Sequence, residues 1–159
     1  KYTLLNLELL LAKQTVAQAG KESGDQRFEN AFNMGWDIIQ DHANDGIVFD
    51  AVTLFYESAE YISIDRATTA CRMLEEVLET KSESVAAYAA RGIIINHYLR
   101  YEGNPGRAML QAYSIIAESS RPAVTAALES PHTYDWVKAL IEYNLAHAYH
   151  NLDKYAEAK

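Results

Sequence analysis

Apolar residues recur at every third or fourth position along most of this chain, in stretches separated by short polar or glycine-containing breaks. Phe28, Phe32 and Trp36 illustrate the pattern, because residues four apart lie on one side of a helix. Gly35 lies beside this stripe and would let a second helix cross closely. The run 93–95 is strand-like alone, but helical spacing encloses it on both sides. The sequence therefore predicts an all-α fold.

The breaks predict where the helices begin and end. Gly20 ends the first helix, and Ser23 with Gln26 three residues later has the form of a capping box for the second. Asp65 is a good N-cap for the fourth helix, and residues 103–106 form a turn before the sixth. The expected helices span residues 2–19, 26–42, 47–61, 66–80, 85–101, 107–119, 122–129 and 136–152.

The composition favours one folded domain. A chain of 159 residues that is 49% hydrophobic and 23% charged can bury a proper core, so we expect a single domain over residues 1–159. The chain opens on Lys1 and closes on Lys159 inside a helical pattern. We therefore expect a segment of a longer protein. The apolar face of the helix over 136–152 would then be covered by the continuing chain or by a second copy.

The charge and the cysteine count restrict the partners and the compartment. A formal net charge of −8 without a basic run argues against nucleic acid and against an anionic membrane surface as the main ligand. The single cysteine, Cys71, excludes an internal disulfide and favours a reducing, cytoplasmic location. We expect Cys71 to be a small buried hydrophobe. No apolar stretch is long enough to predict a membrane span.

Residues near the C-terminus combine sizes that suit closely packed helix pairs. Small Ala146 follows Leu145 and lets a neighbouring helix approach, and Tyr149, three residues further on, fills the space beside it. A polar break at 153–154 turns the chain, and Ala158 begins a return helix. A large residue, a small one, an aromatic one and a later alanine form the pattern of a helix-turn-helix repeat.

A second window shows the same pattern, with Tyr88, Gly92 and Ile95 at matching positions and Arg91 as a departure. The chain thus resembles a tetratricopeptide repeat protein, most clearly over residues 65–159. Gly92 and its equivalent Ala146 are 54 residues apart, whereas the repeat length is about 34. The array is therefore irregular, with an inserted short helix or long loop. The alternative is an irregular helical bundle.

The resemblance implies antiparallel helix pairs stacked as a right-handed α-solenoid, with a concave groove lined by the first helix of each pair. The groove positions that it implies are Ala86, Ala89, Ile93, Asn96 and His97 in one window and Leu140, Tyr143, His147, His150 and Asn151 in the other. This set is apolar, aromatic and neutral polar. It lacks the paired Lys and Asn with which some of these domains clamp a carboxylate, so we expect a helix or extended peptide with apolar anchors as the ligand.

The expected function is recognition without chemistry: a scaffold or protein-protein interaction module that is not an enzyme and needs no cofactor. His147 and His150, three residues apart, could begin a metal site, but no acidic or cysteine ligand stands beside them to complete it. A phosphate-binding glycine loop and a nucleophile elbow are both missing from the sequence.

Two further hypotheses remain open. The first is that the chain is the sensory or regulatory arm of a larger protein, such as a bacterial transcription regulator. A pocket lined by Trp36, Phe55 or Tyr88 would favour that interpretation. A helical-bundle enzyme is the other, and a deep cleft with convergent polar groups would favour it. Self-association through the C-terminal helix face belongs to the leading hypothesis.

Overall fold

The chain folds into helices throughout the part that the structure describes. The structure is a computed structural model that describes residues 2–19, 21–130 and 135–152, and no strand occurs within these ranges. The all-α prediction is confirmed. The helices are α1 (Tyr2–Ala19), α2 (Lys21–Asp41), α3 (Val48–Ile62), α4 (Ile64–Thr80), α5 (Val85–His97), the π-helical η1 (Tyr98–Glu102), α6 (Pro105–Glu118), α7 (Pro122–Glu129) and α8 (Asp135–Asn151).

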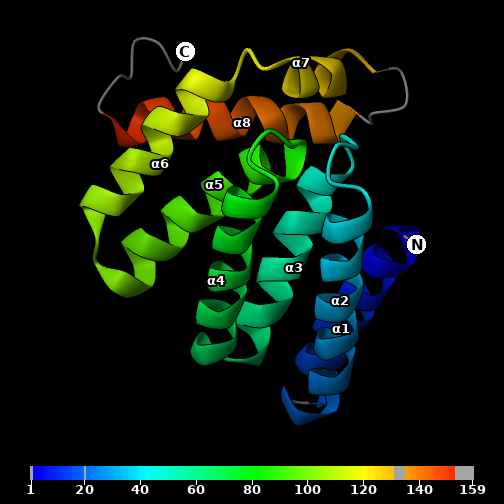
Figure 1. The fold of residues 1–159 in the computed structure, drawn as a ribbon. Coiled ribbons are helices and arrows are strands. Elements are labelled where there is room, and N and C mark those ends of the chain that lie inside the picture. Colours follow the sequence, from blue (N-terminus) through cyan, green and yellow to red (C-terminus); the bar gives the residue numbers. More distant parts are fainter. Residues whose placement is uncertain (1, 20, 131–134, 153–159) are drawn as a thin grey trace.

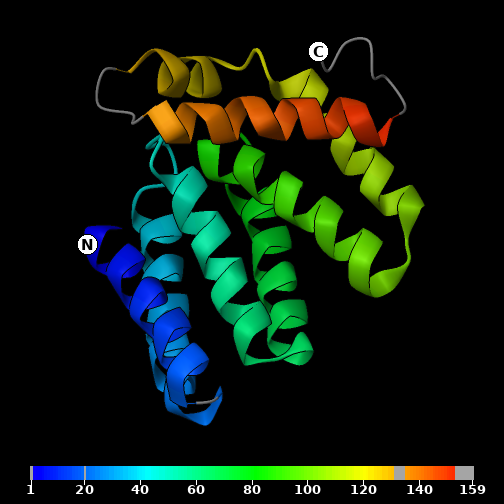
Figure 2. The same cartoon turned by 180° about the vertical axis from the view of Figure 1, so that it is seen from behind.

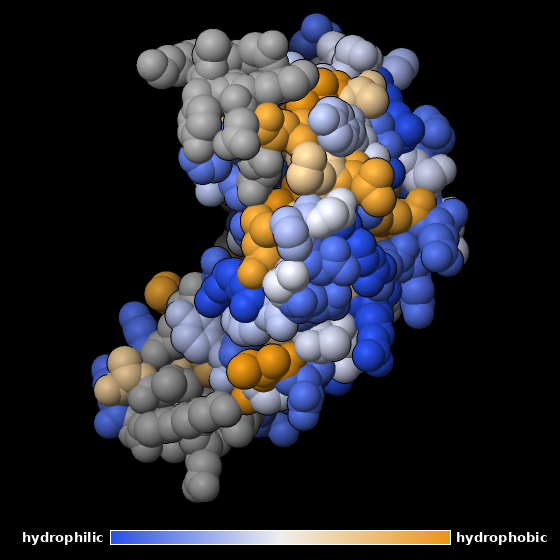
Figure 3. All heavy atoms as spheres, turned by 90° about the vertical axis from the view of Figure 1, so that its left-hand side faces the viewer, coloured by the Kyte–Doolittle hydropathy of each residue, from blue (hydrophilic) through white to orange (hydrophobic). Residues whose placement is uncertain are grey.

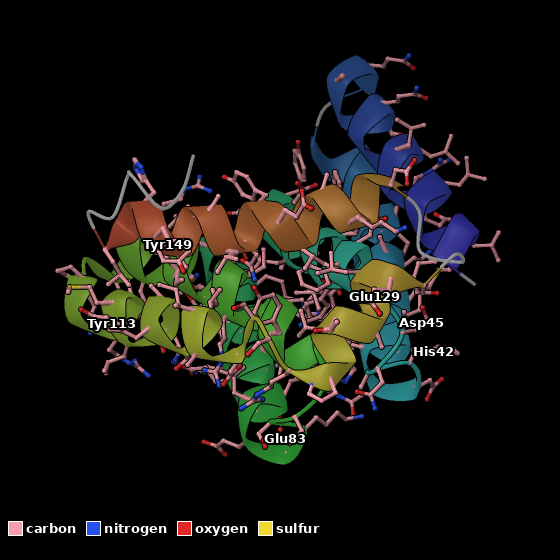
Figure 4. All side chains as sticks on the ribbon, turned by 90° about the horizontal axis from the view of Figure 1, so that it is seen from above. His42, Asp45, Glu83, Tyr113, Glu129 and Tyr149 are labelled. Carbon is pink, nitrogen blue, oxygen red and sulfur yellow. The ribbon has the colours of Figure 1, made fainter. Side chains whose placement is uncertain are left out.

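The first helices pair antiparallel and form two layers. Figure 2 shows α1, α3 and α5 in the layer nearer the viewer, while α2 and α4 lie behind them. In Figure 1, α8 lies across the upper ends of the helices α2 to α5 instead of continuing their direction. Seen from above, α8 runs alongside α6 and α7, and the labelled Tyr149 lies on its α6 side (Figure 4). None of the described helices is long and apolar enough to cross a membrane.

Two predicted helix N-caps, at Ser23 and Asp65, were wrong. α2 begins at Lys21, so Ser23 lies within the helix and does not cap it. Weak helix formers are tolerated there because α2 packs against α1, and tertiary contacts override propensity. Ser63, and not Asp65, caps α4: its extended backbone lets the hydroxyl accept from the Arg66 amide at 3.1 Å. Asp65 instead lies in the first turn, where a carboxylate favours the helix dipole.

The short helix predicted over residues 122–129 is confirmed as α7 (Pro122–Glu129). Asn104 caps α6 by accepting from the Arg107 amide at 3.1 Å, after Gly103 reverses the chain with a φ of 57°. The return helix expected after 153–154 lies outside the described residues.

Aromatic side chains fill the core between α2 and α3. The ring of Phe55 lies 4.4 Å from that of Phe32 and 5.5 Å from that of Trp36. A Cβ atom at Gly35 would stand 3.0 Å from the Cβ of Phe55. The close helix crossing predicted at Gly35 is therefore confirmed, because a larger residue would push the two helices apart.

A second glycine brings α8 against α5. Asn144 is buried, and its side-chain amide donates to the backbone carbonyl of Tyr88 at 3.0 Å. A Cβ atom at Gly92 would stand 2.7 Å from the Cγ of Asn144, so only glycine leaves room for this amide. Ile141 and Ala148, one turn to either side, are also buried. The contact between Gly92 and Asn144 therefore sets where α8 crosses α5.

Replacing Gly92 by alanine should loosen α8. The added methyl group displaces the Asn144 amide and leaves it buried without its partner, which costs about 1–3 kcal/mol. We expect Gly92→Ala to lower the free energy of unfolding by that amount, measured by urea denaturation.

Gly106→Ala is the matched control, since a Cβ atom there would meet only Asn104 Oδ1, at 3.7 Å. That variant should be neutral or slightly more stable. Equal stabilities for the two variants would contradict the role given to Gly92.

Candidate functional site

The molecule is hollowed on the side where α1, α3 and α5 lie. Figure 2 presents this layer to the viewer, and the same side forms the left edge of Figure 3, where the outline is indented. The upper boundary of this face is α8, because it crosses the ends of the layer (Figure 2). A concave face of this kind is where we look first for a binding site.

A small pocket lies on this face where α3, α5 and α8 meet. Its volume is about 110 Å³. We call it the groove pocket, and it is lined by Phe49 and Thr53 from α3, Ala89, Gly92 and Asn96 from α5, and Tyr143, Asn144 and His147 from α8. The smallest residues that line the pocket are Ala89 and Gly92 on α5. Its wall is apolar and neutral polar, so it suits an uncharged side chain.

Tyr143 and His147 form the outer edge of the groove pocket. Their rings are stacked, with centroids 5.8 Å apart and planes within 7° of each other. The Tyr143 side chain is 62% exposed. Burial and the neighbouring His150 lower the pKa of His147, so its ring is neutral at neutral pH. The neutral His147 ring and the exposed tyrosine together offer a flat aromatic surface at the mouth of the pocket.

The structure brings four of the ten predicted groove residues together in this pocket: Ala89, Asn96, Tyr143 and His147. Ala86 is fully buried, and its amide donates to the carbonyl of Ala43 at 2.8 Å. Ile93 is half-buried against the core, and His150 is exposed. The side chains of Leu140 and Asn151 lie outside what the structure describes, although both residues belong to α8.

His97 lies in a different environment. It is 1% exposed, and its Nδ1 atom is 2.7 Å from the Tyr56 hydroxyl. Its Nε2 atom is 3.7 Å from Glu102 Oε1 and has no hydrogen-bond partner. The Tyr101 ring also lies against it, with centroids 5.3 Å apart. His97 is therefore a core residue between α3 and η1, and it does not line the groove pocket.

Four lining residues were not among the predicted groove positions: Phe49, Thr53, Gly92 and Asn144. Asn144 could have been predicted from the sequence, because it lies between Ile141 and Ala148 on an apolar helix face. A buried amide at such a position needs a hydrogen-bond partner. Phe49 and Thr53 carried none, since nothing in the sequence shows that α8 reaches across to α3.

A second pocket opens between α3 and η1 and was not predicted. Its volume is about 290 Å³, and its lining residues are Glu57, Glu60, Tyr61, Arg100 and Tyr101. Glu60 accepts from Arg100 at 2.9 Å and from the Tyr101 hydroxyl at 2.8 Å. We call this the acidic pocket, since two carboxylates face one guanidinium.

Cys71 is buried, as predicted, with 2% of its surface exposed. Burial, together with the nearby Glu75, raises the pKa of the thiol to about 12, so it stays protonated and unreactive at neutral pH. Among the described residues, no group of three His, Cys, Asp or Glu side chains is placed to hold a metal ion.

Comparison of the chain with protein-family models, with curated proteins and with solved structures finds no match. The resemblance to tetratricopeptide repeats therefore stays a prediction that rests on the residues themselves.

The buried His97 should make stability depend on pH. Burial lowers its pKa below the unfolded value of about 6.5, so the unfolded chain binds a proton before the folded one does. The contribution of His97 to the free energy of unfolding is therefore complete above about pH 6.5. Below that pH it decreases, by at most about 1.4 kcal/mol per pH unit. His97→Gln, which can still bond to Tyr56, should show a smaller fall in Tm between pH 7.5 and 5.5 than the wild type.

His42→Gln is the control, because it removes an imidazole from an exposed position. Its fall in Tm over the same range should match that of the wild type. If His97→Gln behaves like the control, the neutral state assigned to His97 is wrong.

Proposed function

We propose that this chain is a non-enzymatic interaction module of tetratricopeptide-like type that binds a peptide or protein partner on its concave face. The observation that carries the proposal is the groove pocket, an apolar hollow with an exposed tyrosine at its mouth. Four residues that the repeat pattern assigns to the groove, including Tyr143 and His147, line this pocket.

The size of the groove pocket favours a side chain over a whole small molecule. Small-molecule sites typically measure about 300–1,000 Å³, whereas the groove pocket measures about 110 Å³. A single large apolar side chain from a partner would fill it and displace water from Phe49 and Ala89. Tyr143, which is 62% exposed, would then cover the inserted side chain, a role in which tyrosine is enriched at interfaces.

We infer further that the helix pairs follow a solenoid order. The pairs α1 with α2, α3 with α4 and α5 with α6 follow one another along the chain, and the first member of each pair lies on the hollowed side (Figure 2). The stretch that contains α7 precedes α8, so α8 acts as the first helix of an irregular last repeat. The scaffold role, a cytoplasmic location and self-association through α8 remain part of the same proposal.

The alternative of a regulatory arm that binds a small molecule has less support. Trp36, Phe55 and Tyr88, which would have lined its pocket, pack instead against neighbouring rings: Trp36 against Phe55, and Tyr88 against Phe49 at 5.8 Å. A larger pocket of about 560 Å³ lies between Ala43 and Ala123, but mostly polar residues of the loop at 80–84 line it. Its lining contains no aromatic and no large aliphatic side chain, whereas typical ligand sites are lined mainly by such residues.

Selection from a random peptide library on the immobilised chain tests the proposal. We expect enriched peptides that share a large apolar residue, and we expect Tyr143→Ala to weaken their binding about tenfold or more, as loss of an aromatic anchor does. Affinities are measured by fluorescence anisotropy.

Tyr113→Ala is the matched control, since Tyr113 is 53% exposed on α6, away from the groove pocket. It should bind like the wild type. If no peptide is enriched, or if both variants bind as the wild type does, the groove is not the binding site.

A further inference from the structure

The groove pocket and the acidic pocket both lie along α3 and along the chain that runs from α5 into η1. Thr53 lines the first and Glu57 the second, and they are four residues apart on α3. Asn96 and Arg100 stand in the same relation along α5 and η1. Residues four apart lie on one side of a helix, so the two pockets follow each other along one line. We call this line the α3–α5 furrow.

The two ends of the furrow have different chemistry. The groove pocket is walled by Phe49, Ala89 and Gly92 and carries no charged side chain among its lining residues. The acidic pocket holds Glu57 and Glu60 against Arg100. An extended ligand that occupies both ends must therefore match an apolar site at one end and an anionic site at the other.

The internal cation of the acidic pocket can give way to an external one. The Arg100 side chain is 61% exposed, and its ion pair with Glu60 is 2.9 Å long. Ion pairs that are this open to water contribute little to the stability of the fold. The guanidinium can therefore swing into solvent at little cost when a partner's cation approaches Glu60.

A buried carboxyl group on α3 lies close to the acidic pocket in the helix. Asp50 is 8% exposed, and its Oδ2 atom has no hydrogen-bond partner. Burial and the charge of Glu57 raise the pKa of Asp50 to about 7. Asp50 and Glu57 are seven residues apart, which places them two turns apart on one face of α3. A cation that approaches Glu57 would favour the ionised form of Asp50 as well, which adds to the preference of this face for a cationic partner.

The spacing of the two ends fixes the ligand's own spacing. Helical rise is about 1.5 Å per residue, so Thr53 is about 6 Å from Glu57 along the axis and about 12 Å from Tyr61. An extended peptide advances about 3.3 Å per residue. A side chain in the groove pocket and one in the acidic pocket are thus two to four residues apart in the ligand.

We propose that the α3–α5 furrow binds an extended segment of a partner protein in which a lysine or arginine stands two to four residues from a large apolar side chain. The apolar side chain enters the groove pocket beside Tyr143, and the cation lies between Glu57 and Glu60. This inference rests on the proposed function, since it names the partner chemistry of the same groove.

The test uses the peptides selected on the wild-type chain. We expect lysine or arginine to be enriched two to four positions from the apolar anchor, and we expect selection on Glu57→Lys to remove that enrichment. In titrations of one selected peptide, Glu57→Gln should bind about threefold to tenfold more weakly. Glu76→Gln, an exposed carboxylate on α4, should bind like the wild type.

A change in the peptide provides a second measurement that leaves the protein untouched. Replacing its arginine by glutamine should weaken binding to the wild type by the same factor and should have no effect on binding to Glu57→Gln. Together the two changes form a double-mutant cycle, which distinguishes loss of the charge contact from partial unfolding of the Glu57 variant.

The outcomes separate the two proposals. If the selected peptides depend on Tyr143 but show no basic preference, and Glu57→Gln binds them normally, the furrow inference is overturned and the groove function stands. If no peptide is enriched, or none depends on Tyr143, the proposed function fails and the furrow inference falls with it.

Discussion

The hydrogen bond from the Asn144 amide to the Tyr88 carbonyl determines where α8 lies, and the rest of the concave face depends on it. A buried amide must find a partner, so α8 can slide or rotate on α5 only by breaking this bond. Gly92 makes the bond possible because it leaves the space that the amide occupies. Tyr143 and His147 take their places over α3 as a consequence. One polar contact, and not the apolar packing alone, thus specifies the upper boundary of the groove.

The helices themselves were largely readable from the sequence because apolar spacing and turn residues act locally. The stripe of Phe28, Phe32 and Trp36 gave the packing face of α2, and Gly35 gave its close crossing with α3. Helix starts were harder to predict, because serine and aspartate are both preferred N-cap residues and Ser63 and Asp65 are only two positions apart. The backbone conformation at Ser63 decides between them.

The candidate site was predictable only in part, for a related reason. The repeat pattern assigns positions on α5 and α8 separately, and four of those positions meet in the groove pocket. His97 was assigned to the same groove, yet it is buried against Tyr56 and Tyr101, because it lies on the side of α5 that packs against α3. The contribution of Phe49 and Thr53 depends on the path of α8 across α3. Only tertiary structure determines that path.

The π-helical turn at the end of α5 has a consequence for how this surface can vary. Its backbone bonds span five residues in place of four, so it accommodates one residue more than an α-helical turn. Deleting a single residue within Tyr98–Glu102 would therefore restore α-helical geometry with little change in the direction of the chain that follows. The same deletion inside α5 would rotate every residue beyond it by about 100°. The end of α5 is thus the point at which this helix can change in length without losing its packing on α3.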